Sequence, residues 1–304
     1  MNIKINEKII FALREQKPLV ALETAVLTHG LPKPLNLETV LAMEEAVASA
    51  GAIPCTIGVL QGEIILGLSQ TQLQDLAQRE NVFKIGLREL PVIVVKKLSG
   101  GTTVAATAYL AHRYGLRVLA TGGIGGVHRG ATQTFDISAD LTVLARTPLT
   151  VVASGAKAIM DLGLTLEYLE TMGTTVVGYK TKTFPAFYAS SSPYKLPLSL
   201  NSPQEIAATA LARDELGLSA AVLICNPVPE AAQIPYEDLM ELLAAVEQEV
   251  QAEHIRGQDV TPLFLKRLAE KSGGRSLEAN RALLIENARL AGKIALAVAQ
   301  GKNS

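Results

Sequence analysis

Short apolar runs alternate with stretches of amphipathic helical pattern along most of the chain. The runs rich in aliphatic and β-branched residues are interpreted as strands: Leu19–Leu22, Ile53–Val59, Glu63–Leu66, Val92–Val95, Arg117–Ala120, Leu149–Ala153, Thr175–Tyr179 and Ala220–Cys225. Apolar residues at spacings of three and four predict helices over Leu37–Ser49, Thr71–Arg79, Val104–Tyr114 and Ala156–Met172. This alternation indicates an α/β fold, which we expect to be a layered α/β/α architecture with a mixed, largely parallel central sheet.

The second half of the chain shifts towards helix, which predicts a helix-rich C-terminal part. Helices are expected from Pro203 to Glu215, from Tyr236 to His254, from Thr261 onwards and from Ser276 to Ala299. The longest irregular segment, Phe184–Ser202, is rich in Ser and Pro, and a lid over a binding site is one interpretation of it. Because neither an internal repeat nor a low-complexity linker interrupts the pattern, we expect a single catalytic domain over residues 1–304.

Composition narrows the function classes. Lys and Arg number 28 and Asp and Glu 29, for a net charge of -1, and their even spread argues against a nucleic-acid or anionic-membrane partner. Hydrophobic residues make up 48% of the chain, yet no run of about 18 uncharged apolar residues occurs, so the apolarity belongs to a core. Cys55 and Cys225 lie in apolar runs and read as reduced core residues. With no apolar stretch of signal length near the start, we expect a cytoplasmic protein that binds a small ligand.

Lys157 follows the run Leu149–Ala153 and the dipeptide Ser154-Gly155, where a helical pattern begins. The pattern predicts Ser154 as the helix N-cap and Lys157 in the first turn. The positive end of the helix dipole disfavours an ammonium ion there, and burial would disfavour it further, so a neutral, nucleophilic amine is expected. Such an amine suggests Schiff-base chemistry, although a lysine whose stem only covers apolar neighbours fits the same pattern.

Glycine-bearing turns follow three of the strand-like runs, and each could hold an anion on backbone N–H groups at a helix start. The turn Leu98–Val104 carries hydroxyls and small residues that suit a phosphate or a ribose. In Thr121–Gly130, a G-x-G-x-x-G match from Gly123 places His128 where the third glycine belongs, which argues against a dinucleotide site. His128 would instead sit on an exposed loop, where its imidazole either reaches a substrate or is simply solvated. The third turn is Ser154-Gly155.

Carboxylates complete the candidate chemistry. Glu23 ends the first long apolar run, and burial there would raise its pKa towards that of a general acid at neutral pH; a salt bridge to a lysine is the alternative. Asp136 and Asp140 flank Ile137-Ser138-Ala139, a spacing that could aim both carboxylates into one cavity. One or two carboxylates with water are typical of Mg²⁺ or Mn²⁺ sites, although Asp and Ser clusters also cap helices and form turns.

Taken together, these segments resemble the pseudouridine-5'-phosphate glycosidase family, also called indigoidine synthase A-like proteins, over nearly the whole chain. The segments that carry the resemblance are Ala21–Ala25, Gly100–Thr107, Ala120–Arg129, Asp136–Asp140, Gly155–Lys157, Phe184–Phe187 and Asn226–Pro229. Several long motifs in the same order are far more specific than one glycine loop. One departure lies beside Lys157, because the family often has serine where this chain has Ala158.

The resemblance implies a role for individual residues. Lys157 is expected to be the covalent nucleophile, Glu23 the proton donor and Asp136 the residue that holds a manganese ion, where Mg²⁺ would suit the same ligand. Expected substrate contacts are Lys84, Val104, His128, Ser138, Ala139, Asp140 and Asn280. The resemblance also implies a homotrimer. Because 304 residues are accounted for by the glycosidase part, pseudouridine kinase is expected to be a separate chain.

The expected reaction is the reversible cleavage of pseudouridine 5'-phosphate to uracil and ribose 5-phosphate, by an enzyme of the carbon–oxygen lyase class. In this substrate the uracil is joined to the ribose through carbon, so the leaving-group protonation used by ordinary glycosidases does not apply. A lysine imine with a ring-opened sugar offers another route. Two alternatives stay open. One is a hydrolase of N-linked nucleotides with Glu23 and Asp140 as its carboxylate pair; the other is a sugar-phosphate or nucleotide-binding regulator without catalysis.

Overall fold

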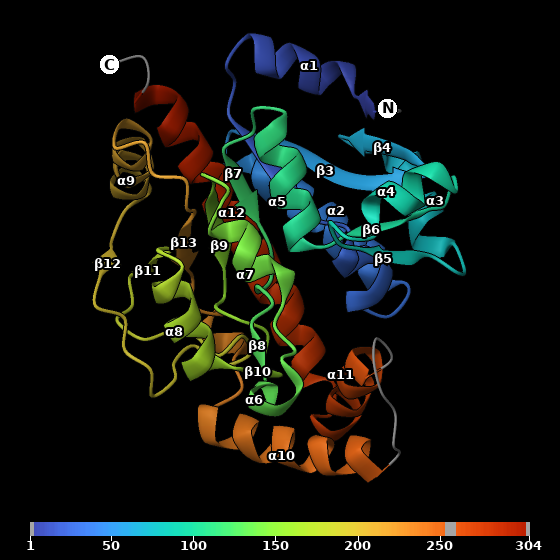
Figure 1. The fold of residues 1–304 in the computed structure, drawn as a ribbon, viewed down its shortest axis with the longest axis vertical. Coiled ribbons are helices and arrows are strands. Elements are labelled where there is room, and N and C mark those ends of the chain that lie inside the picture. Colours follow the sequence, from blue (N-terminus) through green and yellow to red (C-terminus); the bar gives the residue numbers. More distant parts are fainter. Residues whose placement is uncertain (1–2, 253–259, 302–304) are drawn as a thin grey trace.

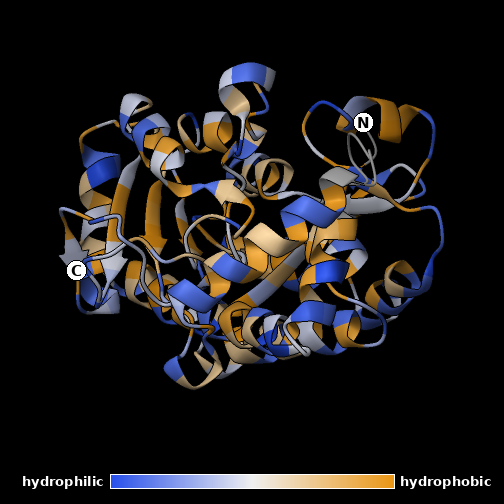
Figure 2. Cartoon of the chain, turned by 90° about the horizontal axis from the view of Figure 1, so that it is seen from below, coloured by the Kyte–Doolittle hydropathy of each residue, from blue (hydrophilic) through white to orange (hydrophobic). Residues whose placement is uncertain are grey.

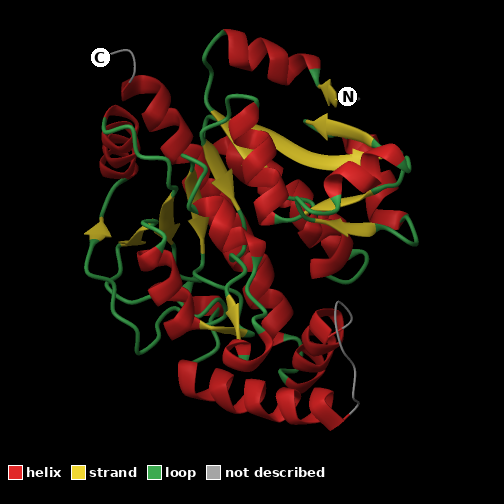
Figure 3. Cartoon of the chain, viewed as in Figure 1, coloured by secondary structure: helices red, strands yellow, loops and turns green. Residues whose placement is uncertain are grey.

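The computed structural model describes residues 3–252 and 260–301, and its backbone is organised around one large sheet (Figures 1 and 3). Its strands are β1 (Ile3–Ile5), β2 (Leu19–Leu22), β3 (Ile53–Leu60), β4 (Glu63–Leu66), β5 (Phe83–Ile85), β6 (Gly100–Thr102), β7 (Val118–Ala120), β8 (Val127–His128), β9 (Thr150–Ala153), β10 (Met160–Asp161), β11 (Thr175–Tyr179), β12 (Ser199–Leu200) and β13 (Val222–Cys225). Within the described residues, eleven of these strands form the main sheet, and β8 pairs separately with β10.

The main sheet runs in the order β1-β4-β3-β2-β7-β9-β13-β11-β12, while β6 pairs with both β3 and β5. The ladders from β3 through β2, β7, β9 and β13 to β12 are all parallel. Only the pairings of β3 with β4 and with β6 are antiparallel within this sheet, as far as the described residues extend. The expected mixed, largely parallel sheet is confirmed.

Helices cover both faces of the sheet, which confirms the layered α/β/α architecture (Figure 1). They are α1 (Glu7–Arg14), α2 (Leu35–Ser49), α3 (Gln70–Gln78), α4 (Leu90–Val95), α5 (Val104–Arg113), α6 (Ala131–Thr134), α7 (Ala139–Leu144), α8 (Leu162–Thr171), α9 (Pro203–Glu215), α10 (Tyr236–Ala252), α11 (Val260–Lys271) and α12 (Arg275–Gly301), with a π-helical turn η1 (Val26–Gly30) and a 3-10 turn η2 (Glu230–Ala232). The long α12 packs against α2 and α9 and lies along β2, β7 and β9. Part of the predicted helix Tyr236–His254 lies outside the described residues.

The core sits between the sheet and its helices, where the strands carry the most hydrophobic positions (Figure 2). Strands β2, β7, β9 and β13 are buried along their whole length, as parallel strands covered on both faces must be. Cys55 and Cys225 are buried free thiols inside this core, as the apolar runs around them predict. None of the described helices is both long and apolar enough to cross a membrane.

Two of the predicted elements are wrong. The apolar run Val92–Val95 lies in helix α4 rather than in a strand, because Pro91 near the helix start fixes a helical φ and short apolar runs carry no period of their own. The predicted helix Ala156–Met172 begins only at Leu162, where the Asp161 side chain caps α8. Ser154 is therefore not an N-cap, and Lys157 does not lie in a first helical turn.

The first part of the segment Phe184–Ser202, up to Ala189, is packed into the protein, and much of the rest is exposed. Phe184, Ala186, Phe187 and Tyr188 are buried, and the Ser192 hydroxyl donates to the Phe184 carbonyl at 2.6 Å. Ala186 bridges in antiparallel fashion to Gly155, which ties the segment to the turn before Lys157. In this structure the first part of the segment is a wall of the core and of the site described next.

Candidate active site

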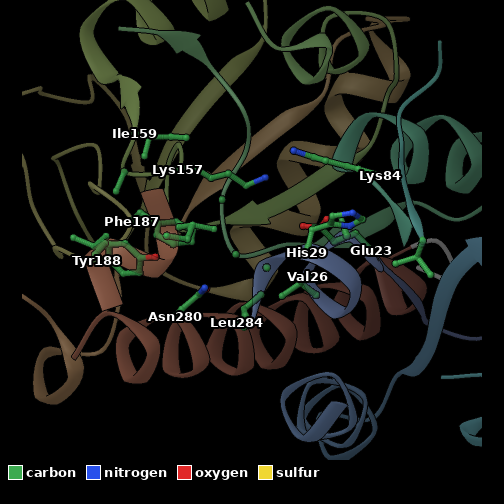
Figure 4. Close-up of a pocket in the computed structure, with 18 of the residues that line it drawn as sticks. Glu23, Val26, His29, Lys84, Lys157, Ile159, Phe187, Tyr188, Asn280 and Leu284 are labelled. Atoms are coloured by element: carbon green, nitrogen blue, oxygen red, sulfur yellow. The ribbon is translucent and has the colours of Figure 1, made fainter. Parts of the chain in front are cut away.

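A cavity of about 460 Å³ opens where β2, β7 and β9 end, and it gathers residues from distant parts of the chain (Figure 4). Of the predicted site residues, it brings together Glu23, Lys84, Lys157 and Asn280 on its wall. Figure 4 shows Lys157 and Lys84 reaching towards each other across the cavity, with Glu23 beneath them. The carboxyl edge of a parallel sheet is the expected place for such a site. Val104, His128, Asp136, Ser138, Ala139 and Asp140 do not line this cavity.

Glu23 is the first residue after β2 and is only 4% exposed. The Thr121 hydroxyl, at the end of the neighbouring strand β7, donates to its carboxylate. Burial raises the pKa of Glu23, and the positive charge of Lys157 and the Thr121 hydrogen bond oppose that rise. Glu23 is thus buried, as its apolar surroundings in the sequence predict, and its pKa is raised with the charge of Lys157 acting on it.

Lys157 lies on an extended stretch between β9 and β10, held by backbone hydrogen bonds on both sides. Its N–H donates to the Ile124 carbonyl at 2.9 Å, and the Ile124 N–H donates to the Gly155 carbonyl at 3.1 Å. Gly155 turns the chain with φ of 75°, and a Cβ there would lie 2.1 Å from the Pro185 carbonyl oxygen. The half-buried side chain points into the cavity, and its amine has no hydrogen bond or ion pair to the other described residues. The backbone before Lys157 is thus held by the bridges of Gly155 to Ala186 and of Ala156 to Ile124, and because no helix begins at Lys157, helix-dipole activation does not apply.

Lys84 belongs to the edge strand β5, which pairs with β6 so that Lys84 stands opposite Gly101. Partial loss of water and the charge of Lys157 lower the pKa of Lys84, while Asp140, Glu23 and Glu89 oppose the change. The residue remains accessible to solvent at the rim of the cavity. Two lysines facing one space create a positive field that suits a phosphate-bearing ligand.

The remaining walls are mostly apolar, with a few polar groups. Asn280 of α12 is 7% exposed, lines the cavity, and makes no side-chain hydrogen bond to the other residues that the structure describes. Phe187 and Tyr188 pack edge to face with ring centroids 4.6 Å apart. The Phe187 backbone has φ of 62°, and its ring lies so close to Gly123 that a Cβ there would be 2.6 Å from Cδ2. An apolar wall with an unused amide suits a planar, polar-edged ligand group.

The start of α5 explains where Val104 stands. Thr103 caps this helix by accepting a hydrogen bond from the Ala106 N–H at 3.4 Å, and the Ala105 N–H donates to Asp140 Oδ1 at 2.8 Å. The Val104 N–H has no acceptor among the described residues, although its side chain is buried. A backbone donor at a helix start is a suitable contact for an anion.

The segment Ser138–Asp140 begins helix α7 beside the cavity rather than on its wall. Ser138 is the N-cap and accepts from the Asp140 N–H at 3.2 Å, and Ala139 is the first helical residue. Asp140 is 4% exposed and joins the start of α5 to the loop after β7, because its second oxygen, Oδ2, accepts from the Gly125 N–H at 2.7 Å. Its charge acts on Glu23 and on Lys84, which places it next to the cavity.

His128 and Asp136 form the outer part of the predicted site. His128 Nδ1 lies 3.8 Å from an Asp136 carboxylate oxygen, with side chains 30% and 65% exposed. Burial and the charges of Lys84 and Lys157 lower the pKa of His128, and Asp136 opposes them. Among the described residues no group of three or more His, Cys, Asp or Glu could hold a metal ion. The exposed carboxylate of Asp136 fits a hydrated Mn²⁺ or Mg²⁺ held by one protein ligand, and does not fit a closed cage.

In two of the glycine-bearing turns predicted to bind an anion, glycines and several backbone N–H groups make contacts within the protein. Gly100 and Gly101 belong to β6, where a Cβ would lie 2.1 Å from the Phe83 carbonyl and 2.3 Å from the Thr28 hydroxyl. Their glycines thus serve close packing. In Thr121–Gly130 the N–H groups of Ile124 and Gly125 donate to protein acceptors. Neighbouring strands and loops thus use several of the N–H groups in these two turns, while the Val104 N–H at the end of the first turn has no acceptor among the described residues.

His29 is a site residue that the sequence pattern did not single out. It lies in η1 and lines the cavity, and its Nδ1 is 2.7 Å from the Thr28 hydroxyl. Burial and the charge of Lys84 lower the pKa of His29, while the Val82 backbone raises it. The motif Thr28-His29-Gly30 carried a signal, since an imidazole soon after Glu23 is a polar group at the same sheet edge. Tyr188 had no such signal, because only long-range packing brings it here.

Comparison with known proteins gives consistent results. The model of a family described as indigoidine synthase A like protein matches residues 8–297. The pseudouridine-5'-phosphate glycosidase of Solibacter usitatus is 47% identical over 295 residues, which are 97% of this chain and 99% of that protein. The enzyme of the same name from Geobacillus kaustophilus is 45% identical over 290 residues, which are 95% and 96% of the two chains.

Solved structures agree with the sequence comparison. The crystal structure of an indigoidine synthase A-like protein from Thermotoga maritima superimposes with a TM-score of 0.89 at 36% identity, covering 98% of this chain and 97% of that one. A prealnumycin C-glycosynthase, AlnA, solved in complex with ribulose 5-phosphate, gives a TM-score of 0.92 at 34% identity, covering 100% and 99%. The fold and the full-length match therefore point the same way.

Proposed function

Because the chain belongs to the family of indigoidine synthase A-like proteins, we propose that it is a pseudouridine-5'-phosphate glycosidase. The reaction is the reversible cleavage of the bond between ribose C1' and uracil C5, which with water gives uracil and ribose 5-phosphate. The relatives of this name, at 45% and 47% identity over nearly the full length, are one support.

The observation that carries the proposal is the convergence of Lys157, Glu23 and Lys84 on one cavity from three separate segments of the chain. The base of pseudouridine is bonded to C1' through carbon, so there is no glycosidic oxygen between sugar and base for the carboxylic acid of an ordinary glycosidase to protonate. An amine bonded to C1' can instead donate its lone pair to form a C=N bond as the C1'–C5 bond breaks. A cavity that brings together an unbonded lysine and an acid whose pKa is raised suits that chemistry.

In the first step the neutral Lys157 amine attacks C1' and the C1'–O4' bond breaks. Glu23, whose raised pKa favours the protonated form, gives its proton to O4', and its carboxylate takes up the proton that the new secondary amine sheds. Glu23, protonated again by that step, next gives its proton to uracil C5. The nitrogen lone pair then forms the C=N bond while the C1'–C5 bond breaks, and the electron pair of that bond restores the C5=C6 double bond of uracil; the proton left on nitrogen returns to the Glu23 carboxylate when the imine is hydrolysed. Water hydrolyses the imine and releases ribose 5-phosphate and the lysine amine.

The substrate phosphate is placed between Lys84 and the Val104 N–H, with His128 nearby. Binding energy at this remote group would offset the opening of the sugar ring. The uracil ring is placed against Phe187 and the Asn280 amide, which offers one donor and one acceptor side. Asp136 would hold the Mn²⁺ ion, which when bound would order water and add positive charge near the phosphate.

Four further properties belong to the same proposal. The enzyme works as a homotrimer in the cytoplasm and is of the carbon–oxygen lyase class. Its substrate is supplied by a separate pseudouridine kinase. Light scattering on the purified protein tests the trimer: a mass three times that of the 32.2 kDa chain is expected, and a monomeric or dimeric mass would contradict it.

Product analysis tests the reaction. Incubation with pseudouridine 5'-phosphate should release free uracil, and the N-linked isomer uridine 5'-phosphate should stay intact. Uracil from the N-linked isomer, with Lys157→Ala still active, would instead support the hydrolase that uses Glu23 and Asp140. Tight binding of both nucleotides without release of uracil would support a regulatory binding protein.

Trapping tests the intermediate. Borohydride added with ribose 5-phosphate should reduce an imine and leave a stable adduct, which peptide mapping should place on Lys157. Lys84 faces the same cavity and is the internal control, because an unselective reaction would modify both lysines. An adduct on Lys84 alone, or none on Lys157 in an enzyme that releases uracil, would overturn the mechanism.

A further inference from the structure

Asn287 is a fully buried polar residue in the middle of α12, on the side of the helix that faces the sheet. Asn is a weak helix former, and its side chain is rarely buried completely. An Asn in this position therefore lowers helix stability unless its amide has specific partners. The sequence pattern did not single it out.

The Asn287 amide binds the ends of three sheet strands at once. Its Nδ2 donates to the Thr121 carbonyl at 2.8 Å, beyond β7, and to the Ser154 hydroxyl at 3.1 Å, beyond β9. The Gly122 carbonyl is also within 3.3 Å of Nδ2. The side-chain amide of Asn226, which follows β13, donates to Asn287 Oδ1 at 2.9 Å. This hydrogen bond gives a structural role to Asn226, the first residue of the segment Asn226–Pro229, which has no role in the proposed reaction.

Two of these partners, Thr121 and Ser154, lead to the reacting groups. Thr121 donates its hydroxyl to the Glu23 carboxylate, so a fixed Thr121 backbone fixes the proton donor. Ser154 begins the turn that carries Lys157, and its N–H donates to the Gly122 carbonyl at 2.8 Å. The Ser154 carbonyl accepts from the Phe187 N–H at 3.1 Å, which holds the aromatic wall. The segments that carry the proton donor, the nucleophile and the aromatic wall are thus all connected to Asn287 through Thr121 and Ser154.

The chemistry of the contacts requires a carboxamide. Two donors on one nitrogen serve the Thr121 carbonyl and the Ser154 hydroxyl, and one acceptor oxygen serves Asn226. Aspartate would present only acceptors to a carbonyl, and leucine of similar size would leave buried polar groups without partners. Glutamine is one methylene longer in a site with no exposed surface.

We infer that Asn287 is a positioning residue that sets the geometry between Glu23 and Lys157 by tying the ends of β7, β9 and β13 to α12. The inference rests on the proposed function. It does not touch the phosphate side of the cavity, because Lys84 lies on β5 and no bond of Asn287 reaches that strand. Small misplacements of reacting groups slow chemistry much more than they weaken binding.

The test compares Asn287→Leu with Ile294→Ala, a substitution of another fully buried residue of α12 that makes none of these contacts. For Asn287→Leu, kcat for uracil release and the rate of borohydride trapping should both fall about 100-fold, with KM changed less than about threefold. Ile294→Ala should lower the unfolding midpoint while kcat stays within about twofold of the wild type.

A second variant keeps the inference testable if Asn287→Leu does not fold. Ser154→Ala removes one hydroxyl partner with little change in volume, and it should slow trapping by about tenfold with KM nearly unchanged. A folded Asn287→Leu or Ser154→Ala enzyme with wild-type kcat, or an equal loss of kcat in Ile294→Ala, would overturn the inference. Trapping uses ribose 5-phosphate alone, so a wild type that traps the sugar but releases no uracil would refute the proposed function and leave this comparison intact.

Discussion

The wall of the cavity and the adjoining loop from Gly125 to Asp140 use their polar side chains in opposite ways. On the wall, Lys157 and Asn280 have side chains that make no hydrogen bonds to other described residues and that face open space. In the loop, Ser138 and Asp140 direct their oxygens to backbone N–H groups. The wall has groups free for a ligand, and the loop holds the surrounding backbone in place. Residue type alone does not distinguish the two tasks; the partner of each polar atom does.

Glu23 tests the wall side of this comparison with the largest expected effect. Glu23→Gln keeps the size and can still accept from Thr121, but it has no proton to give, so kcat/KM for uracil release should fall about 10²- to 10⁴-fold. The pKa of Glu23 is raised by burial, so wild-type activity should decline as pH rises through that value, and the variant should lack this decline. Steady-state rates across pH measure both.

Glu44 is the matched control for that experiment. It is a carboxyl whose pKa burial also raises, and it too accepts from a threonine hydroxyl, that of Thr56, away from the cavity. Glu44→Gln should leave kcat/KM and its pH profile unchanged. An alkaline decline that survives in Glu23→Gln would show that another group donates the proton.

Asp140 tests the loop side, where the expected effect is on stability. Asp140→Asn keeps one acceptor oxygen, yet two N–H groups on separate segments, those of Ala105 and Gly125, need one each. One buried donor then faces an NH₂ group, and the free energy of unfolding should fall by about 1–3 kcal/mol. Urea denaturation measures it.

Asp161→Asn supplies the contrast. Among the described residues, the Asp161 side chain accepts only from the Leu164 N–H, as the N-cap of α8, and asparagine is an equally good cap. Its unfolding free energy should change by only about 0.5 kcal/mol or less. Equal losses in the two variants would mean that the two hydrogen bonds of Asp140, to Ala105 and to Gly125, do not stabilise the protein more than an ordinary helix cap does.

The sequence predicts the sheet and the main helices well because the strands of a parallel sheet that is covered on both faces are short apolar runs, and the helices that cover it show a helical period of apolar residues. It fails at Val92–Val95, where a short apolar run has no period, and at Lys157, where local pattern suggests a helix. That pattern is overridden by the docking of Ala156 onto Ile124 and of Gly155 onto Ala186, which are contacts between segments far apart in the chain.

The candidate site shows the same division. Glu23 is predictable because a strand end and an apolar context are local features. His29, Tyr188 and Asn287 are not, because their roles depend on which distant segments surround them. Resemblance to a family identified Lys157, Lys84 and Asn280 as site residues, whereas local physics alone gave Lys157 for a reason that the backbone does not support.

Glu23 gives a second, smaller prediction, this time on stability. Its pKa in the folded protein lies above the ordinary value of 4.5, so the folded state binds the proton more tightly than the unfolded state. The stability that this proton confers is complete below the ordinary pKa and is lost as pH rises through the raised one. At neutral pH, Glu23→Gln should therefore be more stable than the wild type, by an amount that grows with pH across that interval. Thermal unfolding at a series of pH values measures it, and a pH-independent difference would contradict it.

Asp136 should give the smallest effect on stability, although it lies only four residues from Asp140. Its side chain is 65% exposed and is 3.8 Å from His128, and exposed pairs of this kind contribute little. Asp136→Asn should shift the unfolding free energy by about 0.5 kcal/mol or less in a metal-free buffer. Its effect should emerge only with Mn²⁺, as a loss of the ion's binding measured by calorimetry, because a neutral amide is a weaker ligand than a carboxylate. A large loss of stability without metal would place Asp136 with Asp140 among the residues that hold the loop, and would erase the distinction between a carboxylate kept for a ligand and one bound to the backbone.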